Sequence, residues 1–223
     1  MLKKLLDLLI PGRCAACGAR GEPCCARCEG VWGAAREVVR APTAGLVRVF
    51  ALARYRGVGR KLLIAYKERG RRDLAPSLGR ALAAALAELP LGAVAASARA
   101  PAFCLVPAPS RASAARVRGG PHVERLAKAA ARVLAARGIE VAVAPALELA
   151  GGVRDAVGLS REQRMANLAG RLRFREAGRP PPEMPIVVLD DVVTTGATAA
   201  ACTRALEAAG FTVSAVLTLL AAG

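Results

Sequence analysis

Aromatic residues, histidine and acidic residues are scarce in this sequence. Tryptophan, tyrosine and phenylalanine make up 3% of the 223 residues, so binding of single-stranded nucleic acid by base stacking has little support. His122 is the only histidine, and we interpret it as the start of a helix rather than as a catalytic base. No apolar run without charges reaches the length needed to span a bilayer, so we expect no transmembrane segment.

The shortage of acids leaves a strongly basic chain. It has 33 Lys and Arg residues against 17 Asp and Glu residues, which gives a net charge of +16. Such a balance favours partners such as nucleic acid, acidic membrane surfaces or phosphorylated metabolites, and an Arg-rich solvated surface is the alternative. Residues 1–10 are apolar but short, and Asp7 interrupts them. We therefore expect an amphipathic helix there, no export signal, and a cytoplasmic protein.

Five of the seven cysteines fall between residues 14 and 28. Cys14 and Cys17 form one C-x-x-C knuckle, and Cys25 and Cys28 form a second. Four thiolates suit a tetrahedral structural Zn²⁺ and leave no open position for catalysis. A disulfide fits poorly with a chain that lacks an export signal, and a redox-active pair would not need two knuckles. Cys24 stands beside Cys25 and makes the choice between these two ambiguous, but we favour Cys14, Cys17, Cys25 and Cys28 as the zinc ligands.

Apolar and amphipathic segments alternate over the rest of the chain. Strands are expected at residues 46–55, 103–106, 139–143, 171–174, 186–189 and 211–220. Helices are expected at residues 74–89 and 122–137 and after residue 196 to about 209, with a helix and linker at 29–43. This alternation implies an α/β fold with a mostly parallel sheet flanked by helices. Basic residues gather between residues 54 and 72, where nucleic-acid binding and a solvated basic helix are both open interpretations.

The most informative stretch is residues 186–198. Four apolar residues run into Asp190 and Asp191, which is typical of a buried parallel strand that ends at a site. A strand–loop–helix of this kind directs backbone N–H groups and the positive end of the helix dipole at one spot, which suits a phosphate. The loop and helix start are Val192, Val193, Thr194, Thr195, Gly196, Ala197 and Thr198. Because the two carboxylates could hold a vicinal diol, the stretch predicts a site for a ribose 5-phosphate.

Two further considerations bear on this site. A plain strand–turn–helix with capping threonines is the alternative, and it leaves the adjacent acids unexplained. A basic loop ending in glycines follows the strand expected at 103–106, and it contains Arg111, Arg116 and Arg118. Ligands bind outside the carboxyl ends of strands in open α/β sheets, so these cations are expected to meet a pyrophosphate leaving group.

Residues 186–198 resemble the phosphoribosyl pyrophosphate loop of the type I phosphoribosyltransferases: an apolar strand, two acids, two variable residues and Thr-Gly-x-Thr. Over nearly its whole length the chain resembles the ComF family of competence-associated phosphoribosyltransferase-like proteins. The shared features are the two knuckles, Tyr-x-Gly, a lysine before a basic glycine turn, Val-Pro-x-Pro, Arg-x-x-x-x-Arg-x-Arg-Gly and Gly-Leu-Ser-x-x-x-Arg-x-x-Asn. The family's Phe-Asn-Gln after Arg-Gly is replaced here by Gly120-Pro121-His122, and a Gln often seen before Gly-Leu-Ser is absent.

The resemblance implies a zinc-ribbon module at residues 1–45 and a type I phosphoribosyltransferase fold at 46–223. It implies that Asp190 and Asp191 are the catalytic pair that holds the ribose hydroxyls of phosphoribosyl pyrophosphate, which binds with Mg²⁺. Lys67 would lie on the pyrophosphate side, with Arg164 and Asn167 near the site.

The resemblance also implies a part in DNA uptake, beside a helicase-like partner and with single-stranded DNA as a candidate ligand. Three functions stay open: phosphoribosyl transfer in that setting, nucleobase salvage, and a basic DNA-binding or sensor protein without turnover. No residue is identifiable as a nucleobase reader, so the acceptor is not assigned.

Overall fold

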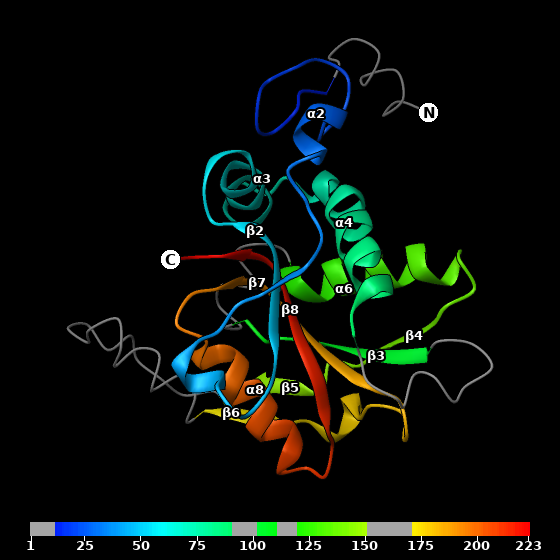
Figure 1. The fold of residues 1–223 in the computed structure, drawn as a ribbon. Helices are drawn as coiled ribbons and strands as arrows, with labels where there is room; N and C mark the ends of the chain where they lie inside the picture. The colour runs from blue at the N-terminus through cyan, green and yellow to red at the C-terminus, as the bar shows by residue number, and fades with distance from the viewer. Residues whose placement is uncertain (1–11, 91–101, 111–119, 151–170) are drawn as a thin grey trace.

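The computed structural model describes residues 12–90, 102–110, 120–150 and 171–223. The amphipathic helix expected at residues 1–10 lies outside these ranges. Figure 1 shows a central sheet with helices on both sides and the cysteine-containing segment at one end of the molecule. None of the described helices is long and apolar enough to cross a membrane.

Six strands form the central sheet in the order β1-β2-β8-β7-β3-β4. They are β1 (Arg36–Glu37), β2 (Val49–Arg54), β3 (Ala102–Pro107), β4 (Glu140–Val143), β7 (Ile186–Val193) and β8 (Val213–Ala221). Every neighbouring pair is parallel except β1 with β2. The expected α/β fold with a mostly parallel sheet is therefore confirmed. Because the strands are parallel, the carboxyl ends of β2, β8, β7 and β3 meet at one edge, where ligands bind in sheets of this kind.

Helices cover both faces of this sheet (Figure 1). On one face pack α3 (Gly57–Glu68), α4 (Ala75–Glu88) and α6 (His122–Ala135). On the other face packs α8 (Ala197–Glu207), and an antiparallel pair lies against it, β5 (Leu147–Leu149) with β6 (Leu172–Phe174). The described residues also form the short helix α2 (Ala26–Glu29) and three turns of 3-10 helix: η1 (Ala41–Thr43), η2 (Arg72–Leu74) and η4 (Glu176–Gly178).

Alternation along the strands separates two apolar layers. In β7, Val187 and Leu189 face the layer with α3, α4 and α6, whereas Ile186 and Val188 face the layer with α8. The sheet is thus covered on both faces, which explains why its inner strands read as continuous apolar runs.

The helices α4 and α6 approach each other closely on one side of the sheet. A Cβ added to Gly79 would lie 2.6 Å from the Cβ of Ala129, so only glycine fits between the two backbones. The start of α6 lies next to the end of α3, because His122 and Lys67 contact the same residue near the end of β7.

The prediction of a helix from residue 29 is wrong. The short helix α2 (Ala26–Glu29) ends at Glu29, and Arg36 and Glu37 then pair antiparallel with β2, opposite Ala51 and Phe50. Pairing with the edge of β2 satisfies backbone groups that a helix would have satisfied internally. A strand of two residues leaves no periodic signal in the sequence, so the pattern of residues 29–43 could not predict it.

The cysteine-containing segment packs on the helical layer. Glu29 accepts hydrogen bonds from Ser77 at 3.0 Å and from Arg80 at 2.8 Å. Arg71 donates to the backbone oxygen of Arg13 at 3.0 Å. The same buried cluster that contains the apolar faces of α3 and α4 also contains Cys14, Cys24 and Cys28. The segment therefore shares an apolar core with the sheet and its helices.

Candidate functional site

The strand β7 continues through both acidic residues and ends at Val193. Successive side chains of a strand point to opposite faces, so Asp190 faces the α8 layer and Asp191 faces the layer of α3 and α6. In agreement, burial and then the charge of Asp190 raise the pKa of the Cys202 thiol on α8. The two carboxylates therefore reach the carboxyl edge of the sheet from opposite faces rather than as an adjacent pair.

Asp191 is 4% exposed, and a lysine and a histidine contact the same carboxylate oxygen. Lys67 Nζ lies 2.7 Å from Asp191 Oδ2, and His122 Nε2 lies 2.6 Å from it. Lys67 is in the last turn of α3, and His122 is the first residue of α6. An unpaired carboxylate would be expensive to bury, so these two contacts allow Asp191 to lie inside the protein.

The pKa values of the two carboxyl groups are shifted in opposite directions. Burial and the charge of Asp191 raise the pKa of Asp190 to about 7. Burial also acts to raise the pKa of Asp191, but the hydrogen bond from His122 and the charge of Lys67 outweigh it and lower that pKa to about 2. At neutral pH the site thus holds one ionised and one partly protonated carboxyl group. Such separation is a recurring property of functional sites.

The loop Thr194-Thr195-Gly196 connects β7 to α8. Gly196 has a φ of +86°, in the left-handed region that favours glycine. The first amides of α8 have no partner inside the helix and point toward this loop, and the amide of Ala197 donates to the hydroxyl of Thr195 at 3.4 Å. The positive end of the helix dipole and the threonine hydroxyls suit an anion.

Arg40 fixes this loop from the N-terminal part of the chain. Its Nε donates to the carbonyl oxygen of Thr194 at 2.6 Å, and its Nη2 donates to that of Ala222 at 2.5 Å. A Cβ added to Gly196 would lie 2.8 Å from the Cβ of Arg40, so glycine is needed there for space as well as for conformation. Sequence reasoning missed Arg40, because it is 154 positions from Thr194 and belongs to no motif.

The structure brings together only some of the site residues expected from sequence. Lys67 and Asp191 are in contact, and Asp190, the residue before Asp191, lies on the other face of the same strand. The residues Val192 to Thr198 form the end of β7, the loop and the start of α8. The remaining expected residues lie outside the described ranges: Arg111, Arg116, Arg118, Arg164 and Asn167.

His122 is the residue that sequence reasoning undervalued. It begins α6, as expected, yet its ring is buried and contacts Asp191. The hydroxyl of Tyr66 donates to the backbone oxygen of His122 at 2.8 Å, so Tyr66 supports this helix start from inside the protein. The sequence did contain one indication of this role, namely the position of His122 at the start of a helix that follows a loop. A helix that begins at the carboxyl edge of the sheet brings its first residue to the site.

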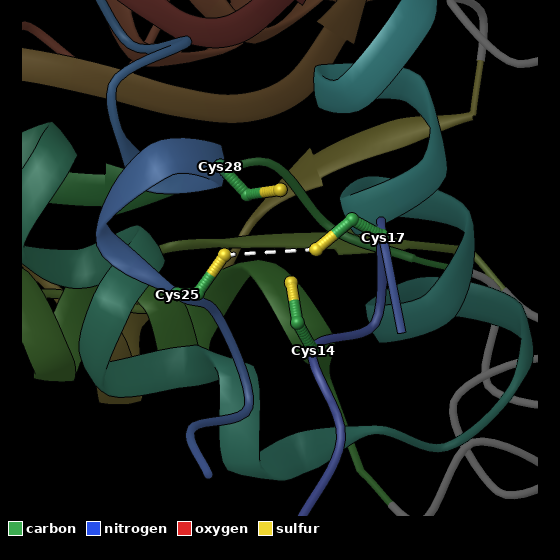
Figure 2. Close-up of side chains that lie close together, drawn as sticks. All are labelled: Cys14, Cys17, Cys25 and Cys28. Carbon is green, nitrogen blue, oxygen red and sulfur yellow. Dashed lines mark hydrogen bonds between the residues drawn. The ribbon is translucent and has the colours of Figure 1, made fainter. Parts of the chain in front are cut away.

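The two cysteine knuckles form a second candidate site. The sulfur atoms of Cys14, Cys17, Cys25 and Cys28 lie within 4.8 Å of one another, and Figure 2 shows them gathered around a common centre. Cys17 Sγ and Cys25 Sγ are 3.6 Å apart. Tetrahedral Zn²⁺ with Zn–S bonds of about 2.3 Å places its sulfurs about 3.8 Å apart. The cluster could therefore hold a metal such as zinc.

The surroundings shift the pKa values of these thiols in opposite directions: burial, and then hydrogen bonds with the other three cysteines, raise the pKa of Cys28. Burial acts to raise the pKa of Cys14, but hydrogen bonds from the backbone at Cys25, Cys17 and Ala16 outweigh it and lower that pKa to about 6. The thiolate is the form that binds metal. Cys24 lies outside the cluster, and burial raises the pKa of its thiol. Between the two adjacent cysteines, the structure thus brings Cys25 to the other three sulfurs.

No family model matches the chain, and no curated protein matches its sequence. The chemistry of both sites therefore has to be argued from the residues themselves. The carboxyl edge of the sheet combines a loop whose amides and hydroxyls suit an anion with carboxylates that can accept hydrogen bonds from hydroxyl groups. The cysteine cluster offers four sulfur ligands and no oxygen or nitrogen ligand, which suits a structural metal.

Single cysteine substitutions should show that Cys25, and not the adjacent Cys24, is a metal ligand. Cys25→Ala is expected to reduce the zinc content of the purified protein from about one atom per chain to near zero, because three thiolates bind Zn²⁺ much more weakly than four. Cys24→Ala is the matched control, since it removes the adjacent thiol and should keep the metal. Elemental analysis by mass spectrometry measures both, and zinc retained by Cys25→Ala but lost by Cys24→Ala would contradict the ligand set.

Asp190→Asn should change how stability depends on pH. The folded pKa of Asp190 is about 7, whereas an unfolded aspartate has a pKa of about 4. Between these values the folded state binds the extra proton, so this carboxyl group makes the protein less stable as pH rises. Asparagine does not titrate, and it keeps an oxygen to accept the Asp191 amide. The Tm of the variant minus that of wild type is expected to grow by about 5–10 °C from pH 5 to pH 8.

Scanning calorimetry at several pH values measures this difference, with two comparison variants. Asp73→Asn removes an exposed acid and controls for the change in net charge. Asp191→Asn is expected to destabilise at pH 5 and at pH 8 by about 1–3 kcal/mol, because Lys67 and His122 lose a buried partner. A Tm difference for Asp190→Asn that stays constant with pH would show that its carboxyl group titrates as in the unfolded chain.

Proposed function

We propose that this chain binds phosphoribosyl pyrophosphate together with Mg²⁺, through a fold of the type I phosphoribosyltransferase kind. One observation carries the proposal. A buried parallel strand delivers Asp190 and Asp191 to the carboxyl edge of the sheet, and a loop with two threonines and a glycine then starts α8. A phosphate suits the loop, and sugar hydroxyls suit the carboxylates. Phosphoribosyl pyrophosphate carries both groups.

Each part of the site would have its own task. The amides and hydroxyls of residues 194–198 would hold the 5-phosphate. Asp191 would accept a hydrogen bond from one ribose hydroxyl, and Asp190 would meet the second from the other face of the strand. Lys67 would add a positive charge on the pyrophosphate side. Bound Mg²⁺ would supply positive charge that offsets the charge of the pyrophosphate.

Transfer to an acceptor is the reaction that such a site supports. A bond would form between the acceptor and C1 of the sugar while the bond from C1 to pyrophosphate breaks, and pyrophosphate would leave with the electron pair. The part played by this chain would be to position the donor and to neutralise its charge. The proposal covers binding of the donor, and the acceptor is left open.

Isothermal titration calorimetry with phosphoribosyl pyrophosphate tests the proposal. Wild type is expected to bind saturably in the presence of Mg²⁺. The double variant Asp190→Asn/Asp191→Asn should bind at least about tenfold more weakly, because the hydrogen bonds that the two carboxyl groups accept from the ligand are lost. Mg²⁺ should be withheld rather than chelated in the metal-free titration, since a chelator would also strip the cysteine cluster.

A charge-matched control is available for this experiment. Asp73→Asn/Glu176→Gln removes two exposed acids and should bind as wild type does. Wild type that shows no saturable binding would overturn the proposal. Full binding by Asp190→Asn/Asp191→Asn would place the ligand at another part of the protein.

We propose as a second candidate function the binding of single-stranded DNA, in the setting of DNA uptake and beside a helicase-like partner. The observation that favours it is a group of exposed basic side chains at the end of β2 and along α3, namely Arg54, Arg56, Arg60, Lys61 and Arg69. Arg60 lies over the ring of Tyr55 at 5.6 Å. Since Tyr66 is buried, phosphate contacts would provide most of the affinity.

Fluorescence anisotropy with a labelled oligonucleotide tests this second candidate. Affinity should fall steeply with salt, and Arg54→Gln/Arg56→Gln/Arg60→Gln should reduce the slope of log K against log salt by about 2–3. The control variant Arg132→Gln/Arg137→Gln/Arg204→Gln removes three exposed arginines from other elements. Equal losses in both variants would mean that net charge, rather than this group of residues, attracts the DNA.

A further inference from the structure

Asp191 is held through one of its two carboxylate oxygens. Lys67 Nζ and His122 Nε2 both contact Oδ2, at 2.7 Å and 2.6 Å. Among the described residues, no hydrogen bond uses Asp191 Oδ1. Two donors from different helices fix the orientation of the carboxylate about its last torsion angle, which is otherwise broad. The direction in which Oδ1 points is thereby fixed as well.

We propose that His122 is a positioning residue of the phosphoribosyl site, which holds Asp191 so that Oδ1 meets a sugar hydroxyl of phosphoribosyl pyrophosphate. This inference rests on the proposed function and adds to it a residue that lies outside the strand–loop–helix. His122 acts through Asp191, because its own ring is buried away from a ligand.

His122 and Lys67 have different tasks in this arrangement. The Lys67 side chain is 31% exposed and flexible, so a bound pyrophosphate can attract its ammonium group. The His122 side chain is 5% exposed, and Tyr66 anchors the backbone at the same residue. His122 therefore keeps Asp191 in place when the ligand competes for Lys67.

The contact also determines where the imidazole carries hydrogen. A nitrogen 2.6 Å from an ionised carboxylate must present an N–H, because two lone pairs would repel each other. The buried Nδ1 of His122 has no partner among the described residues, so an N–H at Nδ1 would be an unpaired buried donor. Both facts favour the tautomer with hydrogen on Nε2, which donates to Asp191.

NMR can observe this contact directly, because His122 is the only histidine of the chain. In the full-length protein without a histidine tag, ¹⁵N-labelled histidine gives the signals of a single imidazole. Asp191→Asn is expected to shift the Nε2 signal strongly, whereas Asp190→Asn, on the opposite face of β7, should shift it much less. Nε2 should also shift when phosphoribosyl pyrophosphate and Mg²⁺ are added. An Nε2 chemical shift that is unchanged in Asp191→Asn would overturn the proposal.

Calorimetric affinities of three variants provide the second test. His122→Leu removes the donor and should weaken binding of phosphoribosyl pyrophosphate about tenfold, the size of one hydrogen bond to a charged group. His122→Gln keeps an N–H donor and should bind within about threefold of wild type. Tyr66→Phe removes the hydrogen bond to the backbone of His122 but leaves the imidazole, so it controls for loosening of the helix start.

The outcomes distinguish this inference from the proposed function. Wild-type affinity in His122→Leu would overturn the positioning role and leave the proposed function intact. Equal weakening in His122→Leu and Tyr66→Phe would make His122 a packing residue and would also overturn the role. Absence of binding by wild type would overturn the proposed function and this inference with it. If His122→Leu does not fold, the affinity of His122→Gln and the response of Nε2 to ligand decide the matter.

Discussion

Burial of an ionised carboxylate at the end of β7 is the constraint on which the carboxyl edge of this molecule depends. Asp191 can be ionised inside the protein only because Lys67 and His122 both reach its Oδ2. The end of α3 and the start of α6 must therefore meet at this point. The helix α6 also packs closely on α4 at Gly79, and the hydroxyl of Tyr66 holds its first residue. The charge of Asp191 thus depends on two helices that pack on the same face of the sheet.

The neighbouring acid has a different environment because a strand alternates its side chains. Asp190 faces α8, where burial and the charge of Asp191 raise its pKa, while the donors that lower the pKa of Asp191 are on the other face. Beyond the two acids, Arg40 ties the loop at Thr194 to the end of β8 and leaves room only for glycine at Gly196. The site therefore combines a loop held by hydrogen bonds from Arg40, one carboxyl group whose pKa is lowered and one whose pKa is raised.

The cysteine cluster depends on residues that are close together in the sequence. Each knuckle brings two thiols together through local turns, so the spacing of the cysteines favoured this set of four ligands and left Cys24 as an alternative to Cys25. The spacing could not choose between Cys24 and Cys25. That choice came from packing, because Cys24 is buried against the helical layer whereas Cys25 faces the other sulfurs. The hydrogen bonds of Glu29 with Ser77 and Arg80 join the segment to α4.

The sequence by itself determined the features that depend on neighbouring residues. Apolar runs predicted the parallel strands. The two acids followed by threonines, a glycine and a helical run predicted the loop before α8, and the spacing of the cysteines predicted a metal site. Tertiary structure decided the rest: the short β1 strand, the clamp that Arg40 forms on the loop at Thr194, and the contact of His122 with Asp191. The last of these joins residues 69 positions apart, and the clamp joins residues 154 positions apart. Periodicity and local motifs carry no information over such separations, because only packing of the helices on the sheet brings these side chains together.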